Sequence, residues 1–266
     1  MSPPLPGWIE ATGLPPGVRG GTATRRFDGV SGHPFGPANY SDRGGDDPAA
    51  IAHNRALLRK QLGLPGEPLW LQQVHGTEVL VEPNLPGSAS SPLPGSASSG
   101  ASSALRAARC ADACVVHGRG SVAVVLTADC LPLLLAAGDS VAAVHAGWRG
   151  LADGVIEAAI RALGALPGEV CAWLGPGIGQ RAFEVGPEVR AIFVAADPAA
   201  AACFIPGRAD RWHADLYALA RGRLRALGVE RISGGGWCTF NDAAQFHSYR
   251  RDGARSGRMA TLVWRE

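Results

Sequence analysis

The chain has 266 residues, 46% of them hydrophobic, and a formal net charge of +2. This length can bury one large core or two small ones, and the near-neutral charge without long basic runs is untypical of a nucleic-acid-binding surface. A chain this large does not need its six cysteines for a disulfide framework, and neither a signal peptide nor an apolar run of roughly 20 residues that could span a membrane is found, so we expect a reduced, cytoplasmic protein.

The amino-terminal part of the chain predicts a flexible lead and then a helix. Residues 1–20 are rich in proline and glycine, and we expect them to form a flexible extension. Asp47-Pro48 predicts a helix that starts with an acidic cap, and Gly63 predicts its end. Two strands should follow, at Leu69–Val74 and Thr77–Glu82.

A low-complexity segment interrupts this pattern at residues 85–103. The sequence LPGSASS occurs there twice in tandem. Serine, alanine, glycine and proline cannot bury enough apolar surface to offset the entropy lost on ordering. We therefore predict a disordered insertion in this segment.

The centre of the chain carries two short apolar runs that predict buried strands. They are Val122–Leu126 and Val141–Val144, separated by turn residues around Asp139. Cys130 follows the first run and His145 the second. Because ligands gather where strand ends meet helix starts, we expect the active site here.

The carboxyl-terminal part mixes strands and helices. Strands are predicted at residues 170–174, 229–233 and 259–264, and helices at residues 151–163, 186–194 and 213–227. These elements do not alternate strictly. We therefore predict a layered α/β protein with a mixed sheet.

Three side chains at predicted strand ends suggest chemistry: His75, Cys130 and His145. Two histidines and one cysteine form a common catalytic zinc set, which leaves a fourth position for water or substrate. Without a metal, a Cys130 thiolate and His145 could instead act as nucleophile and base. The residues alone leave both possibilities open.

A series of motifs resembles one protein family. The likeness covers the chain from about Thr24 to Trp264 and points to the YfiH-like family, also called DUF152, the multicopper polyphenol oxidase (laccase) family or the peptidoglycan editing factor family. The motifs that carry it are Asn54-Arg55, Gln73–Gly76, Thr127–Pro132, His145–Gly150, Gly175-Pro176, Phe183–Gly186, Cys238-Thr239 and Ser248–Gly253.

The resemblance implies a three-layer α/β/α fold with a mixed β-sheet, in one catalytic domain at residues 21–266. It implies Zn²⁺ held by His75, Cys130 and His145, which would also be the catalytic residues. It further implies a purine nucleoside phosphorylase that cleaves inosine, guanosine and adenosine with phosphate. Adenosine deamination and methylthioadenosine phosphorolysis would be additional activities.

Candidate substrate contacts lie in or near these motifs. Guanidinium groups match phosphate oxygens, and phenylalanine rings can stack on a purine base. The candidates are Asn54, Arg55, Arg149, Phe183, Phe246 and Arg250. A purine nucleoside and phosphate would be the partners, with no nucleic acid or membrane, and the chain would be a monomer or a homodimer.

Two alternative functions follow from the same residues. Copper-dependent polyphenol oxidation would place Cu²⁺ in the His₂Cys set, although seven histidines with no His-x-His pair are too few for a multicopper centre. Met1 and Met259 are the only methionines that could supply an axial thioether. A metal-free Cys-His hydrolase, or an editing factor acting on cell-wall peptide precursors, is the other alternative.

Overall fold

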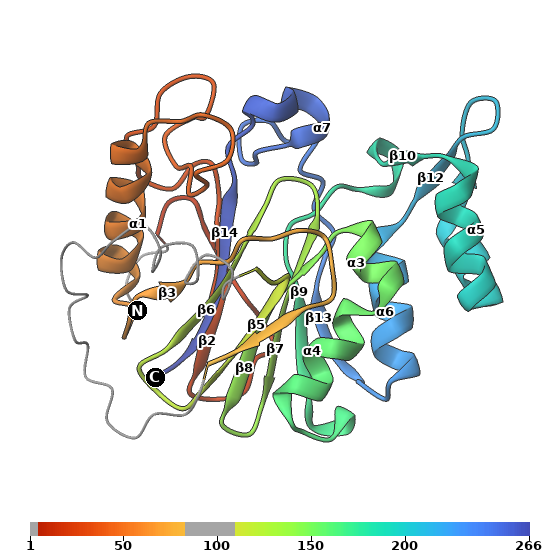
Figure 1. Cartoon of the computed structure of the whole chain (residues 1–266), viewed down its shortest axis with the longest axis horizontal. Coiled ribbons are helices and arrows are strands. Elements are labelled where there is room, and N and C mark those ends of the chain that lie inside the picture. Colours follow the sequence, from red (N-terminus) through yellow and green to blue (C-terminus); the bar gives the residue numbers. More distant parts are fainter. Residues whose placement is uncertain (1–4, 83–109) are drawn as a thin grey trace.

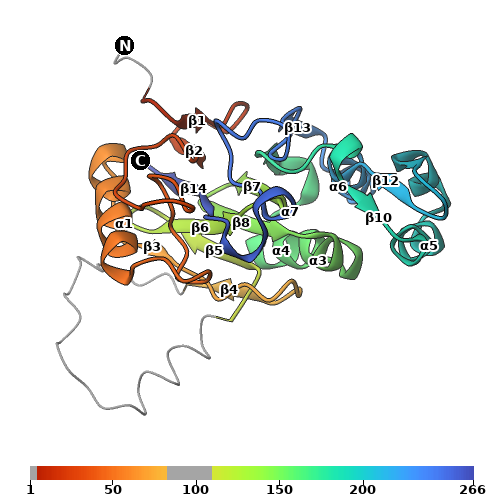
Figure 2. The ribbon, with the colours of Figure 1, turned by 90° about the horizontal axis from the view of Figure 1, so that it is seen from above.

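The computed structural model describes residues 5–82 and 110–266, and the predicted insertion at residues 85–103 lies outside this range. Two β-sheets pack face to face in the described part of the chain, with helices on both outer sides (Figures 1 and 2). The α/β class with mixed sheets agrees with the prediction. The central β layer is double, however, where the sequence predicted one sheet.

The first sheet brings the two ends of the chain together. From edge to edge it contains β1 (Trp8–Glu10), β2 (Val18–Ala23), β14 (Met259–Arg265), β6 (Val122–Thr127) and β3 (Pro68–Leu69). β3 and β6 pair in parallel, and the other neighbours are antiparallel.

The second sheet is built around one hairpin. From edge to edge it contains β13 (Arg231–Gly234), β9 (Cys171–Leu174), β7 (Leu131–Ala137), β8 (Ser140–Ala146), β5 (Ala113–His117) and β4 (Val79–Val81). The outer pairs β13–β9 and β4–β5 are parallel, and the inner pairs are antiparallel. β6 and β7 belong to different sheets, so the link between them crosses from one layer to the other.

Helices cover both outer faces (Figures 1 and 2). α1 (Pro48–Leu62) packs on the first sheet. α3 (Trp148–Asp153), α4 (Val155–Leu163) and α6 (Leu216–Ala226) pack on the second. α5 (Pro187–Ala196) lies beside a small sheet of β10 (Glu184–Val185), β12 (Trp212–Ala214) and β11 (Phe204–Pro206). α7 (Tyr249–Asp252) is a single turn, and short 3₁₀ helices occupy Pro167–Glu169, Gln180–Ala182, Pro198–Cys203 and Gly253–Arg255.

The alternation of side chains along each strand fills three apolar layers. Val124 of β6 faces α1, whereas its neighbour Val125 faces the second sheet. Leu133 of β7 faces the helices, and Leu134 faces the first sheet. A strand buried on both faces is apolar at nearly every position, which explains the continuous apolar run of β7.

The helix predicted after Asp47 is confirmed. The Asp47 carboxylate accepts a hydrogen bond from the backbone N–H of Ala49, Pro48 occupies the first turn, and Gly63 ends the helix with a φ of 60°. The helix predicted at residues 151–163 is two helices instead. Gly154, with a φ of 98°, separates α3 from α4.

Other parts of the chain also differ from the prediction. The strand predicted at Leu69–Val74 is confined to β3, which ends at Leu69. Part of the expected extension at residues 1–20 is sheet, because β1 and β2 pair with each other and β2 pairs with β14. Trp8 also packs near Trp264, with ring centroids 6.4 Å apart. Moreover, β7 is a strand that was not predicted from the sequence. No helix in the described residues is long and apolar enough to cross a membrane.

Candidate active site

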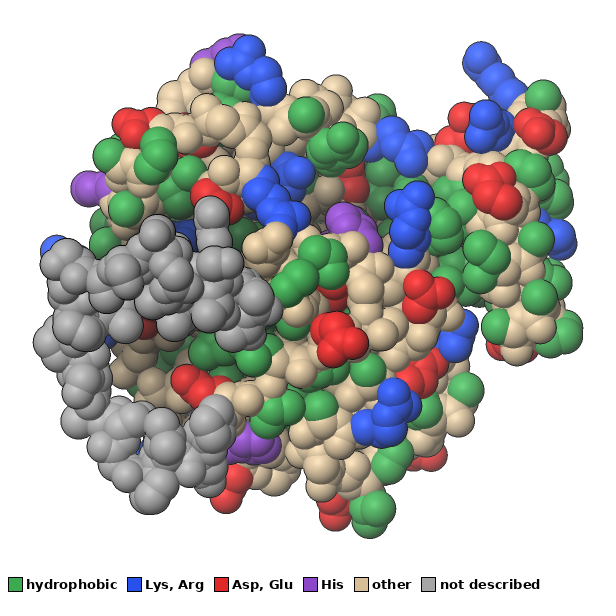
Figure 3. Space-filling model, in the orientation of Figure 1, with side chains coloured by type: hydrophobic (Ala, Val, Ile, Leu, Met, Phe, Trp, Pro, Cys, Tyr) green, Lys and Arg blue, Asp and Glu red, His purple; other side chains and the backbone are tan. Residues whose placement is uncertain are grey.

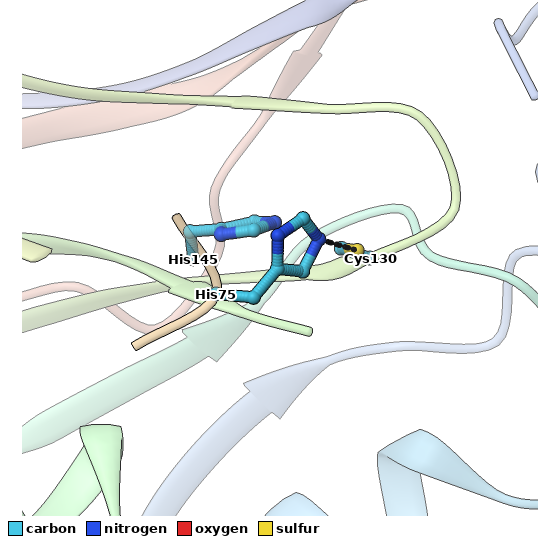
Figure 4. Close-up of side chains that lie close together, drawn as sticks. All are labelled: His75, Cys130 and His145. Atoms are coloured by element: carbon cyan, nitrogen blue, oxygen red, sulfur yellow. Dashed lines mark hydrogen bonds between the residues drawn. The ribbon is translucent and has the colours of Figure 1, made fainter. Parts of the chain in front are cut away.

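His75, Cys130 and His145 meet in space, as we expected from their positions at predicted strand ends (Figure 4). His75 precedes β4, Cys130 lies in the link from β6 to β7, and His145 is near the end of β8. Nε2 of His75 lies 3.7 Å from Sγ of Cys130, and the two imidazole centroids are 4.8 Å apart. One donor atom from each residue lies within 4.8 Å of the others, which is the reach of a single bound metal ion.

A buried carboxylate, Asp112, orients two of these three residues. Its Oδ1 accepts a hydrogen bond from Nδ1 of His145 at 2.8 Å. The same carboxylate accepts the backbone N–H groups of Val74, His75 and Gly76 at 2.7–3.2 Å. The bond to Nδ1 leaves Nε2 of His145 as the donor for a metal. His75 itself has a φ of 64°, a conformation that these backbone bonds hold in place.

Glycine is required where α3 begins beside the cluster. A Cβ atom at Gly147 would lie 2.8 Å from Cδ2 of His75 and 3.2 Å from Sγ of Cys130. Gly147 therefore has to lack a side chain so that His75 and Cys130 can approach its backbone.

The cluster favours a thiolate. Burial alone raises the pKa of the Cys130 thiol, but the positive charge of His145 and hydrogen bonds from both histidines outweigh it and lower that pKa to about 6. For His145, burial lowers the pKa, whereas the Cys130 charge and the Asp112 hydrogen bond raise it to about 9. The thiolate is the form of cysteine that binds metals and attacks electrophiles.

The cluster opens onto a cavity of about 930 Å³. On the face shown in Figure 3, Lys and Arg side chains lie on both sides of a central histidine surface. The charged and aromatic residues that line the cavity are Asp42, Arg43, Arg55, Trp70, Asp129, Phe183, Tyr249, Arg250 and Arg258. Four arginines against two carboxylates favour an anionic ligand.

Three of these arginines lie over aromatic rings. The guanidinium carbon of Arg55 is 4.2 Å from the ring centroid of Trp70, and those of Arg250 and Arg258 are 5.4 Å and 5.6 Å from Phe183 and Tyr249. Stacking fixes the plane of a guanidinium group and leaves its edge free to bind oxygen atoms. The guanidinium group of Arg55 is also held by hydrogen bonds, because its Nε and Nη2 both donate to the carbonyl of Tyr40, at 3.0 Å and 2.7 Å.

Three predicted substrate contacts do not line the cavity. Asn54 is buried and holds a neighbouring loop by bonding Val30, Ser31, Pro37 and Asn39. Phe246 is 1% exposed and belongs to the interior, because residues before α7 turn inward. Arg149 is exposed and lies over the ring of Trp148, 4.4 Å from its centroid. Arg55, Phe183 and Arg250 do reach the cavity.

Sequence reasoning missed Asp129, which ties distant segments to the Cys130 link. Its carboxylate accepts the hydroxyls of Thr239 and Ser248, at 2.6 Å and 3.0 Å, and the backbone N–H of Arg250 at 2.7 Å. Asp129 is buried and has a φ of 89°. Its position directly before Cys130 is the sequence feature that could have identified it. Its unusual backbone conformation is consistent with the finding that strained residues gather at functional sites.

Gln73 and Arg43 position the His75 segment and were also missed. The Gln73 side-chain amide makes two hydrogen bonds of 2.7 Å to the backbone N–H and carbonyl of Leu126. It thereby attaches the segment to β6 as a strand partner would. Arg43 donates to the carbonyl of Gln73 at 2.7 Å and lines the cavity.

Comparisons with known proteins show the family of the chain. A family model described as multi-copper polyphenol oxidoreductase laccase matches residues 21–266. A Xylella fastidiosa protein named purine nucleoside phosphorylase is 45% identical, covering 98% of this chain and 98% of its own. The Escherichia coli protein named purine nucleoside phosphorylase YfiH is 42% identical, covering 98% and 97%.

Solved structures of related proteins have the same fold as this chain. The crystal structure of a DUF152 protein from Neisseria meningitidis matches with a TM-score of 0.84 and 39% identity, covering 98% of this chain and 99% of its own. YlmD from Geobacillus stearothermophilus matches with a TM-score of 0.85 and 25% identity, covering 100% and 98%. The chain therefore belongs to the YfiH-like (DUF152) family, whose model is described as multi-copper polyphenol oxidoreductase laccase.

Proposed function

We propose that the protein is a zinc-dependent purine nucleoside phosphorylase of the cytoplasm. It would convert inosine, guanosine or adenosine and phosphate to the free base and ribose 1-phosphate. The observation that carries the proposal is a His₂Cys donor set on a cavity lined by four arginines and three aromatic residues. The names of relatives at 42% and 45% identity support the same activity.

The donor set fits zinc. The three side chains are the usual ligand types for a catalytic site, and Asp112 supplies the carboxylate that such sites place behind a histidine. When bound, zinc would supply a Lewis acid that orients and polarises an oxygen atom. Copper is less well supported, because Met259 is buried in β14 and does not line the cavity.

The arginines would hold phosphate close to the reacting sugar. Cleavage of an N-glycosidic bond builds positive charge on the ribose, as in glycoside hydrolysis, and a phosphate dianion beside it stabilises that charge. We assign this role to Arg258, which lines the cavity. Burial lowers the pKa of Arg258, and the negative charges of Cys130 and Asp129 oppose that shift, which places its guanidinium in the electrostatic field of the cluster.

A nucleoside panel assayed with and without phosphate tests the proposal. Hypoxanthine release from inosine should rise with phosphate and saturate, and the sugar product should carry the phosphate. Arg258→Gln should raise the phosphate KM at least tenfold, whereas Arg149→Gln, outside the cavity, should not. Base release that ignores phosphate and yields free ribose would contradict phosphorolysis. Adenosine deamination and methylthioadenosine cleavage, which we propose as further activities, are read from the same panel.

A second candidate function, cysteine hydrolysis, depends on Cys130, His145 and Asp112, in which each side chain interacts with the next. The bond between His145 and Asp112 and the lowered pKa of Cys130 also suit a metal-free cysteine hydrolase, including one that acts on cell-wall peptide precursors. Metal analysis separates the two candidates. One zinc per chain, lost in His75→Ala together with activity, supports the phosphorylase, because the three hydrolase residues do not include His75.

A further inference from the structure

Tyr249 is the most exposed tryptophan, tyrosine or phenylalanine among the described residues that line the cavity. Of the three aromatic residues among its described lining, Phe183 is only 8% exposed and lies under Arg250. Trp70 is half-buried, lies under Arg55 and is nearly parallel to Tyr40, with an angle of 14° between the rings. Tyr249 is 52% exposed.

The Tyr249 ring is supported from one side. The guanidinium carbon of Arg258 lies 5.6 Å from the ring centroid. A cation over one face holds the ring in place, and the high exposure of Tyr249 means that much of the ring remains uncovered. Tyr249 lines the cavity, so a ligand there can contact the uncovered part of its side chain.

The position of Tyr249 relative to the metal ligands is fixed by hydrogen bonds. Its two chain neighbours are both bonded to Asp129, through the Ser248 hydroxyl at 3.0 Å and the Arg250 N–H at 2.7 Å. Asp129 directly precedes Cys130. The backbone that carries Tyr249 is therefore held on both sides by the residue beside the cluster, which limits how far the ring can move from the reacting centre.

We propose that Tyr249 is the platform on which the nucleobase stacks, and that it makes the cavity selective for purine over pyrimidine nucleosides. The inference rests on the proposed function. A stacking platform recognises the area of a planar ring and not its pattern of hydrogen-bonding groups. The bicyclic purine covers more of the tyrosine ring than a pyrimidine does, and hypoxanthine, guanine and adenine should be accepted alike.

Binding of inosine and uridine in phosphate-free buffer, measured by equilibrium dialysis, tests the platform separately from catalysis. Tyr249→Ala should raise the inosine Kd about tenfold, within the range for removal of one base–aromatic stack, and should shrink the preference for inosine over uridine. Tyr249→Phe should restore both, because the ring and not the hydroxyl makes the stack. Ile192→Ala, at an exposed position on α5, is the control and should match the wild type.

Kinetics add a second readout. Tyr249→Ala should raise the nucleoside KM more than the phosphate KM, because Arg258 lies over the Tyr249 ring and loses that contact. An inosine Kd within twofold of the wild type in Tyr249→Ala would overturn the stacking role and leave the phosphorylase proposal standing. A wild-type protein that binds no nucleoside would overturn both. Equal increases in both KM values would show that Tyr249 only supports the fold of the site.

Discussion

The Asp112 carboxylate lies 2.8 Å from Nδ1 of His145 and accepts the backbone N–H groups of the segment that carries His75. One buried side chain thus positions two of the three candidate metal ligands. Burial raises the pKa of Asp112, but the His145 hydrogen bond and the backbone N–H groups outweigh it and lower that pKa. The carboxylate therefore stays ionised behind the site.

Asp112→Asn should weaken metal binding. Loss of such a supporting carboxylate typically costs 10–100-fold in metal affinity, and we expect a decrease of about that size, measured by competition with a chelator. Asp210→Asn is the matched control, because Asp210 has a side chain 73% exposed. An unchanged zinc affinity in Asp112→Asn would contradict the role assigned to this carboxylate.

Gly147→Ala should disturb the cluster without unfolding the protein. The new methyl group would press on His75 at 2.8 Å and Cys130 at 3.2 Å, so we expect substoichiometric zinc by elemental analysis. The backbone at Gly147 is extended and alanine adopts it without strain. Gly168→Ala, with nothing within 4 Å of the added carbon, should keep full metal content. Full zinc occupancy in both variants would show that the His75 loop yields freely.

Asp129→Ala should destabilise the fold. Three donors lose their acceptor, two of them in buried hydrogen bonds, and a φ of 89° is unfavourable for alanine. We expect a loss of about 2–4 kcal/mol in the free energy of unfolding, measured by urea denaturation. Asp129→Asn should lose less, because asparagine tolerates left-handed backbone and keeps one acceptor oxygen. A loss below about 1 kcal/mol for alanine would mean that water replaces the carboxylate.

Stability should fall in mild acid because His247 is buried in its neutral form. Burial is the main reason that its pKa is lowered to about 4, and Nε2 lies 3.0 Å from the carbonyl of Ala38. The unfolded state gains a proton near pH 6.5, whereas the folded state gains it only near pH 4. The free energy of unfolding should therefore decrease between these pH values, by up to about 3 kcal/mol.

The control for this titration is His247→Gln. The variant should be less stable at pH 7, since the interior is repacked, yet its stability should change less with pH in the same window. The difference between the two pH profiles isolates His247, because all other titrating groups are shared. Parallel profiles for wild type and variant would assign the acid sensitivity to other residues.

The sequence was sufficient to predict features that depend on residues close together in the chain. Asp47, Pro48 and Gly63 specify the ends of α1 through hydrogen bonds and backbone preferences within a few residues. The apolar runs of β6 and β8 indicated buried strands. The three candidate ligands were predicted from their places after predicted strands and from the motif resemblance, and the structure brings them together. Motif resemblance identified the family before any coordinate was needed.

The tertiary structure decided whatever depends on segments far apart in the chain. Asp112 and Asp129 bind residues 33–121 positions away, so the local sequence does not show which groups these carboxylates hold. Only the folded chain showed that Arg55, Phe183 and Arg250 line the cavity and that Asn54, Phe246 and Arg149 do not. Asn54 and Arg55 are adjacent in sequence, yet Asn54 is buried against a loop while Arg55 reaches the cavity. The division into two sheets was also decided by the tertiary structure. β6 and β7 belong to different sheets, and the chain crosses between them in the link that carries Cys130. The packing of three apolar layers determines this arrangement, and the composition of either strand does not.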